Sequence, residues 1–177
     1  MRSEQNWKKV RTADGVIGYV KNKTLKNEEK KNITRKFEEQ DYSNITKDYT
    51  INMAWHQVTN QTANGNVADV LGRTKGVNVI SPTWFYLNDN SGNIASLCSS
   101  DYVTYCHQQG IEVWGLVSNL ENSDVDSTSV LNLTSSRDNL VNNLVAEAIK
   151  YDLDGIILDR CRYDDYGLES DFSDISK

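Results

Sequence analysis

The feature that most constrains the fold is an alternation of short apolar runs with helix-like segments, which fills the chain from Tyr49 onward. Residues 49–58 and 77–87 are apolar or aromatic runs of strand length, and a short helix closed by Gly72 is predicted between them. The order then repeats with a helix over 101–109, a strand over 111–117, a helix over 135–151 and a strand over 155–159. Strands that alternate with helices favour parallel pairing through right-handed crossovers. The predicted class is therefore α/β, either a doubly wound sheet or a barrel.

The helix over 135–151 has the clearest pattern in the chain. Ser135 and Asp138 fit a capping box at its start. Its apolar residues form one stripe at helical spacing, made of Leu140, Val141, Leu144, Val145, Ala148 and Ile149. The stripe predicts that this helix packs on the sheet.

A β-hairpin is predicted before the α/β region. Residues 7–12 and 16–20 are rich in strand-forming residues, and Gly15 between them can adopt the positive φ of a tight turn. A lone hairpin is marginally stable, so it belongs to a small β module or decorates the next domain. Residues 21–31 are polar and have little to bury, which indicates a linker and a domain boundary.

Composition restricts the partners. With a net charge of −6 the chain has no basic face broad enough to neutralise a row of phosphates, so an uncharged polymer is a better candidate than nucleic acid. No stretch approaches the roughly 20 apolar residues of a membrane helix, and an export signal, if any, would lie upstream. Cys98, Cys106 and Cys161 match no zinc-ligand spacing with His56 and His107, so no metal or cofactor is expected.

Candidate binding residues lie where the strands are predicted to end, which is where α/β barrels build their active sites. These are Trp55, Trp84, Tyr86, Trp114 and Asn119. Flat aromatic faces can stack on sugar rings, and no phosphate-cradling glycine loop offers a competing explanation. Any one of the tryptophans is more readily explained by core packing, but the set of three predicts a sugar-binding cleft.

Three ionisable residues are candidates for catalysis. His56 could act as an acid or base, although a structural hydrogen bond is the favoured role. Asp154 and Asp159 bracket the apolar run 155–158, and strand alternation sends them to opposite faces unless a bulge intervenes. Asp159 is the better catalytic candidate because it ends the strand, whereas Asp154 could cap the turn that enters it.

Five segments also carry a family resemblance, in the order WKKVRTADGVIGYV, TINMAWHQV, GVNVISPTWFYL, GIEVWGLVSNL and LDGI. They resemble glycoside hydrolase family 18 proteins of spore-forming bacteria, in which a wall-binding module of the bacterial Src-homology-three type precedes the barrel. The resemblance implies that residues 1–27 end that module. It also implies that residues 28–177 form strands one to four, the N-terminal half of a TIM (β/α)₈ barrel of about 250 residues. Chitin or peptidoglycan would be the substrate, outside the cell or in its envelope.

The family's strand four carries the pattern D-G-x-x-x-D-x-E, in which the Glu protonates the glycosidic oxygen and the preceding Asp orients the attacking N-acetyl group. The resemblance assigns Asp154 and Gly155 to the first two positions and Asp159 to the orienting Asp. Cys161 occupies the position of the Glu. A thiol, with an ordinary pKa of about 8.5, is a poor proton donor, so hydrolysis by this chain is not expected.

The tail departs from that family. Asp159, Arg162 and Tyr163 fit an L-D-x-x-R-Y motif that resembles family-10-like barrel glycosidases, which leaves a junction of two genes and a divergent enzyme both open. Four interpretations remain open as well: an inactive glycosidase for β-linked N-acetylglucosamine polymers, a non-catalytic carbohydrate-binding barrel, a barrel glycosidase of the family-10-like kind, and a doubly wound domain that lacks the usual glycine-rich first turn. A half barrel has two open sheet edges, which predicts self-association.

Overall fold

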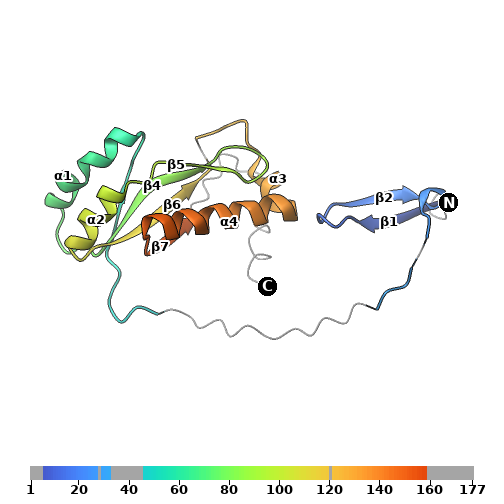
Figure 1. Ribbon diagram of the computed structural model, residues 1–177, viewed down its shortest axis with the longest axis horizontal. Coiled ribbons are helices and arrows are strands. Elements are labelled where there is room, and N and C mark those ends of the chain that lie inside the picture. Colours follow the sequence, from blue (N-terminus) through green and yellow to red (C-terminus); the bar gives the residue numbers. More distant parts are fainter. Residues whose placement is uncertain (1–5, 28, 33–45, 120, 159–177) are drawn as a thin grey trace.

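The computed structural model describes residues 6–27, 29–32, 46–119 and 121–158 (Figure 1). Its elements in chain order are β1 (Trp7–Arg11), β2 (Ile17–Lys21), the 3₁₀ turn η2 (Asn22–Thr24), β3 (Met53–His56), the 3₁₀ turn η3 (Gln61–Asn66), α1 (Val67–Gly72), β4 (Val79–Leu87), β5 (Ile94–Ser96), α2 (Ser100–Gln108), β6 (Glu112–Ser118), α3 (Ser127–Asn132), α4 (Thr134–Tyr151) and β7 (Gly155–Leu158).

Four parallel strands form the main sheet, in the order β3-β4-β6-β7. The spatial order follows the chain order, as it does in a barrel, whereas a doubly wound sheet reverses its order at a switch point. The predicted α/β class and its four strands are confirmed.

The short strand β5 is absent from the sequence-based prediction. It runs antiparallel beside the end of β4, with Phe85 opposite Ser96. Asp89 holds the turn before it, because its Oδ1 accepts hydrogen bonds from the N–H groups of Ser91 (2.8 Å) and Asn93 (3.2 Å). This hairpin lengthens the sheet on the side that α4 covers.

The hydrophobic core lies between the sheet and its helices. Ile80 and Trp84 of β4 and Val113 of β6 meet Tyr102 of α2 and Leu144 of α4 there. Full burial of an aliphatic side chain of this size contributes about 1.5–3 kcal/mol. We call the side of the sheet that carries these residues the outer face, and the opposite side the inner face.

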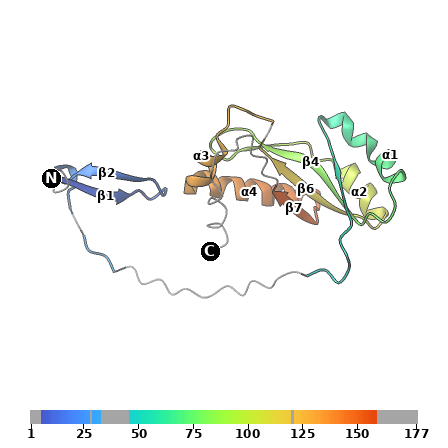
Figure 2. The same cartoon turned by 180° about the vertical axis from the view of Figure 1, so that it is seen from behind.

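The start of α4 differs from the prediction. The helix begins at Thr134 with Leu133 at its N-cap, which makes no side-chain cap, so the predicted capping box of Ser135 and Asp138 is wrong. The acceptors come from the hairpin turn instead. Asp14 accepts hydrogen bonds from the N–H of Ser135 (2.7 Å) and from its hydroxyl (3.0 Å), and both views place the hairpin tip at this end of α4 (Figure 1, Figure 2).

Only part of the apolar stripe of α4 is buried against the rest of the protein. Leu140 and Leu144 are buried, as predicted. Val141, Val145 and Ile149 remain 53%, 51% and 77% exposed. These three residues form an exposed apolar ridge on the helix.

The predicted N-terminal hairpin is confirmed. β1 and β2 pair antiparallel with Trp7 opposite Lys21 and Arg11 opposite Ile17, and Gly15 in the turn has a φ of 89°. The division of the chain after residue 27 stays a prediction. Within the described residues, no helix has the length and apolar character needed to cross a membrane.

Candidate functional site

The alternation of side chains along each strand decides which residues reach the inner face. His56 contacts Tyr102 of α2 on the outer side, so the preceding Trp55 points inward. Ile80 and Val113 belong to the outer core, so Ser81 and Trp114 also point inward. The inner face is the side that would line the interior of a closed barrel.

One row of residues crosses the inner face from strand to strand. Trp55 pairs with Ser81, and Trp114 pairs with Gly155. Ser81 and Trp114 lie side by side on β4 and β6. On either side of them Ile80 pairs with Val113 and Thr83 pairs with Leu116, in one unbroken register. A Cβ at Gly155 would lie 3.0 Å from Cγ of Trp114, so the absence of a side chain lets the indole lie over this residue.

The three tryptophans predicted to bind sugar occupy three different environments. Trp55 is 68% exposed on the edge strand β3, where its ring is free for a ligand. Trp114 is half-buried, and it is the third residue of β6 rather than its end. Trp84 is 0% exposed on the outer side. The position of Trp84 argues against its predicted role, since the core already covers both faces of its indole.

Trp84 is fixed by polar partners as well as by packing. Its Nε1–H donates to Oδ1 of Asn64 (2.8 Å), and Asn64 in turn donates to the carbonyl of Leu97 (2.8 Å). The Tyr102 ring meets the Trp84 ring edge-on, with 4.9 Å between centroids. These contacts tie η3 and α2 to β4, which is a structural role.

His56 belongs to the same buried network. Its Nδ1 lies 2.9 Å from the hydroxyl of Tyr102, and the two rings stack. Burial lowers the pKa of His56, which favours the neutral imidazole. The structural role favoured from the sequence fits this position.

Tyr86 and Asn119 lie at the C-terminal ends of their strands, where they were expected. Tyr86 is half-buried and pairs with Ser118 of β6. Asn119 directly follows β6, and its Nδ2 donates to the hydroxyl of Ser127 (3.1 Å). In the described part of the chain, Oδ1 of Asn119 and the hydroxyl of Ser81 are buried without a hydrogen-bond partner. Both atoms are enclosed by the protein, so they are within reach of an ordered water rather than of a ligand.

Of the two acidic candidates, Asp154 lies within the described residues. Asp154 immediately precedes β7, so it lies at the N-terminal end, opposite the ends where barrels place their chemistry. Its Oδ2 accepts from the backbone N–H of Val113 (2.8 Å) and lies 2.9 Å from Nε2 of His107. Asp154 therefore links β7 to β6 and α2, whereas the sequence suggested that it caps the turn entering its own strand. Asp159 and Cys161 lie outside the described residues, so their assignments stay predictions.

Sequence reasoning missed a polar cluster at the N-terminal end of the inner face. The carboxylate of Glu112 accepts hydrogen bonds from Lys47 (2.7 Å), Tyr49 and Trp114 (2.9 Å). Burial alone would raise the pKa of Glu112, but these three donors outweigh it and lower the pKa to about 2. The signal was a single charge at the start of an otherwise apolar strand, IEVWGLV.

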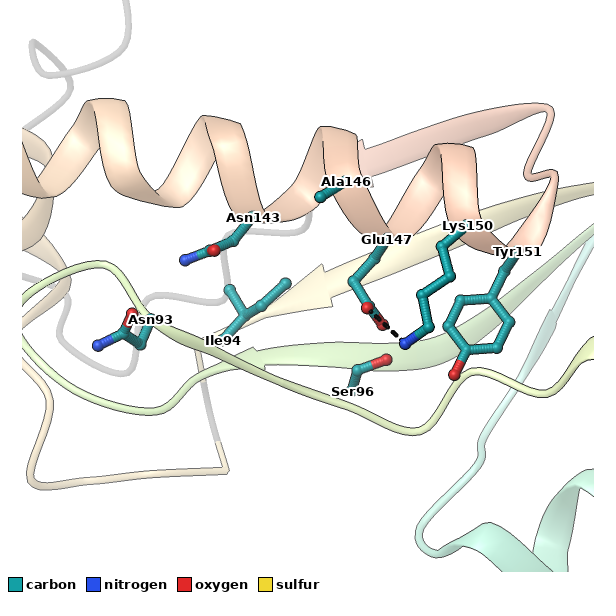
Figure 3. Close-up of a pocket in the computed structure, with 8 residues that line it drawn as sticks. All are labelled: Asn93, Ile94, Ser96, Asn143, Ala146, Glu147, Lys150 and Tyr151. Carbon is teal, nitrogen blue, oxygen red and sulfur yellow. Dashed lines mark hydrogen bonds and ion pairs between the residues drawn. The ribbon is translucent and has the colours of Figure 1, made fainter.

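A small pocket opens on the outer side, between β5 and α4 (Figure 3). Its volume is about 360 Å³, and its lining is mostly polar. The ammonium of Lys150 pairs with Glu147 at 3.0 Å and lies 4.5 Å from the centroid of the Tyr151 ring. These charges are already satisfied by each other, and the pocket lies on the opposite side of the sheet from Trp55.

The two cysteines of the described residues, Cys98 and Cys106, do not form a reactive site. Cys98 and Cys106 are buried and unpaired. Burial raises the pKa of both thiols to about 12, so neither is a ready nucleophile. Within the described ranges, no group of three potential ligands from His, Cys, Asp and Glu comes close enough to hold a metal ion.

Comparison with known proteins finds similarity in structure only. No protein-family model and no curated protein matches the sequence. The C-terminal domain of a candidate chitinase from Desulfitobacterium hafniense superposes with a TM-score of 0.55 at 16% identity, covering 66% of this chain and 35% of that one. A chitinase from Bacteroides thetaiotaomicron gives 0.51 at 12% identity, covering 66% and 38%. The spore cortex-lytic enzyme SleL of Bacillus cereus gives 0.48 at 14% identity, covering 60% and 26%.

The two comparisons with TM-scores above 0.5 establish the fold. The parallel sheet of this chain matches part of a chitinase (β/α)₈ barrel, and the N-terminal hairpin is an addition to it. The chain spans little more than a third of the length of the two chitinases with the higher TM-scores. The barrel expected from the sequence is therefore confirmed for strands β3, β4, β6 and β7.

Proposed function

We propose that this chain is a glycosidase-type barrel segment of the family 18 kind that binds β-linked N-acetylglucosamine polymers, chitin or peptidoglycan, without cleaving them. The exposed indole of Trp55 on the inner face carries the proposal. An aromatic ring of this size held open on a rigid strand is a stacking platform for the flat face of a sugar. Such polymers lie outside the cytoplasm, so the proposal includes an extracellular or cell-envelope location.

The charge of the chain supports binding of a neutral ligand. The net charge of −6 fits a neutral polymer better than a polyanion.

Cys161 supports binding without cleavage. It stands where the resemblance requires the proton-donating Glu. Loss of a general acid slows a reaction by typically about 10²–10⁴-fold. The orienting role of Asp159 can persist without the acid, because it acts on the bound N-acetyl group.

Calorimetric titration with N-acetylglucosamine oligomers and peptidoglycan fragments tests the proposal, together with an assay for new reducing ends. We expect binding without release. Trp55→Ala should abolish binding, whereas Trp7→Ala, which removes another exposed tryptophan from the hairpin, should leave it unchanged. A well-folded sample that binds none of these saccharides would contradict the proposal, and release of reducing ends would contradict its non-catalytic part.

A further inference from the structure

The N-terminal hairpin has a charge opposite in sign to that of the whole chain. Residues 6–27 contain six Lys and Arg residues and one acid, Asp14, although the chain as a whole has a net charge of −6. Asp14 is itself engaged by Ser135 at the start of α4. The hairpin therefore produces a local positive field that attracts anions.

The strand pairing places half of these cations on one face of the hairpin. Partners across an antiparallel pair lie on the same side, and so do residues two apart along a strand. One face is formed by three cross-strand pairs: Trp7 with Lys21, Lys9 with Tyr19, and Arg11 with Ile17. Each pair joins one cation to one aromatic or aliphatic side chain. We call this surface the ladder face.

The ladder face is exposed over its whole length. Tyr19 is 66% exposed, whereas Val10 and Val20 on the opposite face are partly buried. Three cations are costly to bury without acidic partners, so the ladder face belongs at a surface. This holds whether or not the hairpin is part of a larger β module.

The cations of the ladder face are available to an anionic ligand. Among the described residues, no carboxylate lies within ion-pair distance of Lys9, Arg11 or Lys21. The ammonium of Lys21 lies 5.4 Å from the centroid of the Trp7 ring, a cation–π contact that holds its charge in place. Tyr19 is the ring on which a ligand can stack, because Lys21 lies over Trp7.

The hairpin is anchored on the rest of the chain by its tip. Asp14 accepts hydrogen bonds from the N–H (2.7 Å) and the hydroxyl (3.0 Å) of Ser135, and its carbonyl accepts from the N–H of Thr134 (3.2 Å). Both views show β1 and β2 extending away from α4 beyond this contact (Figure 1, Figure 2). A lone two-stranded hairpin is marginally stable, so the anchor helps to hold the ladder face in shape.

We propose that the ladder face binds a polysaccharide that carries phosphate groups. Lys9, Arg11 and Lys21 contact the phosphates, which are the anions that these side chains bind most readily. Tyr19 stacks on a sugar ring. The alternation of cation and ring along the face matches a polymer in which charged groups alternate with sugars.

The spacing of the cations favours a sparsely charged polymer. Lys9 and Arg11 lie two residues apart on β1, which separates their Cα atoms by about 6.8 Å. A nucleic-acid duplex carries one charge per about 1.7 Å of its axis, and each strand one per about 3.4 Å. Three cations at the wider spacing neutralise few of those charges, whereas they match a glycan with a phosphate on one sugar in every one or few.

Titration of the full chain with phosphomannan tests the proposal, with neutral mannan as the matched polymer that lacks phosphate. We expect calorimetry at low salt to show binding of phosphomannan and none of mannan. Binding should weaken as the salt concentration rises, because salt screens exposed charges. A folded chain that binds neither polymer at low salt, or binds mannan as tightly as phosphomannan, would overturn the proposal.

Charge reversal locates the binding surface. K9E/R11E should weaken phosphomannan binding about tenfold or more, because two attractive contacts become repulsive. K23E/K26E is the matched control, since it changes the charge of the hairpin by the same amount at exposed positions after β2. It should weaken binding by no more than about threefold, through the general field alone. Equal losses in the two variants would contradict a site on the ladder face.

Tyr19 tests the contribution of the ring. Tyr19→Ala should weaken phosphomannan binding about two- to tenfold, whereas Tyr19→Phe keeps the ring and should retain the affinity. Neither change should alter binding of polyphosphate, which has the charge without the sugar. Tighter binding of oligo(dT) or of poly-glutamate than of phosphomannan would assign the ladder face to nucleic acid or to an acidic peptide, and the proposal would be wrong.

This proposal and the proposed function fail separately, because they involve different elements and ligands of different charge. Trp55→Ala should leave phosphomannan binding unchanged. K9E/R11E should leave the binding of neutral N-acetylglucosamine oligomers unchanged. A chain that binds phosphomannan alone would remove the proposed function and keep the ladder face, and a chain that binds the neutral oligomers alone would do the reverse.

Discussion

The carboxylate of Asp154 accepts a hydrogen bond from the backbone N–H of Val113, with 2.8 Å between the two atoms. This contact joins the start of β7 to the start of β6, and the same Oδ2 lies 2.9 Å from Nε2 of His107 at the end of α2. Asp154 is therefore part of the structural framework. It holds two strands and a helix together at the end of the sheet away from the candidate site.

Asp154→Ala is expected to reduce stability and leave saccharide affinity unchanged. The change leaves the backbone N–H of Val113 without its acceptor, and an unsatisfied buried donor costs about 1–3 kcal/mol of stability. Urea unfolding followed by circular dichroism measures the effect. Asp152→Asn, at the neighbouring left-handed position with φ 56°, is the matched control, because asparagine tolerates that conformation. Loss of binding in a folded Asp154→Ala protein would instead place this residue at the site.

The strand and helix pattern could be predicted from the sequence because it depends on local periodicity. The four parallel strands and the long helix follow from apolar runs and their spacing. The roles of the tryptophans could not be predicted in the same way, because alternation defines two faces without saying which one the helices cover. Trp84 shows the difficulty: the register of β4 shifts between Thr83 and Phe85, and that irregularity is invisible in the sequence.

Contacts between distant segments were also beyond prediction. Asp14 caps α4 from 121 residues away, and local rules led instead to a capping box with Asp138. Glu112 accepts hydrogen bonds from Lys47 and Tyr49, which both precede β3. Nothing in the sequence of that segment indicates that Glu112 is their acceptor. Such pairs depend on how the elements pack, which no window of the sequence contains.

Asp14→Ala is expected to weaken the contact between the hairpin and the helix. The aspartate satisfies the N–H and the hydroxyl of Ser135, and loss of an N-cap acceptor costs about 0.5–2 kcal/mol. Amide hydrogen exchange in the first turn of α4 should accelerate. Asp14→Asn keeps one acceptor oxygen and should have a smaller effect. Equal exchange in Asp14→Ala and wild type would show that the cap contributes nothing in solution.

Gly115→Ala is expected to strain the outer core. A Cβ at this position would lie 2.6 Å from Cε2 of the buried Phe85 and 3.3 Å from Cδ1 of Leu153, so the Phe85 ring or the β6 backbone must move. Overpacking of this kind costs about 1–3 kcal/mol. The control is Gly18→Ala in the hairpin, where a Cβ meets nothing within 4 Å. Thermal unfolding should separate the two variants, and equal midpoints would contradict the packing described for β6.

Glu112 makes the fold sensitive to acid. Its folded pKa of about 2 lies below the ordinary value of 4.5, because the hydrogen bonds from Lys47, Tyr49 and Trp114 outweigh the effect of burial. A depressed carboxylate pKa stabilises the fold above the ordinary pKa, and that contribution disappears as the pH falls from about 4.5 toward 2.

Glu112→Gln should therefore be less stable than wild type at pH 7, and this difference in unfolding free energy should narrow by pH 3. Urea unfolding at both pH values measures this, with the exposed Glu121→Gln as control. A difference in unfolding free energy that stays constant with pH would mean that Glu112→Gln destabilises the fold through lost packing rather than through lost charge. The cluster at the N-terminal end of the inner face would then not depend on the ionised carboxylate of Glu112.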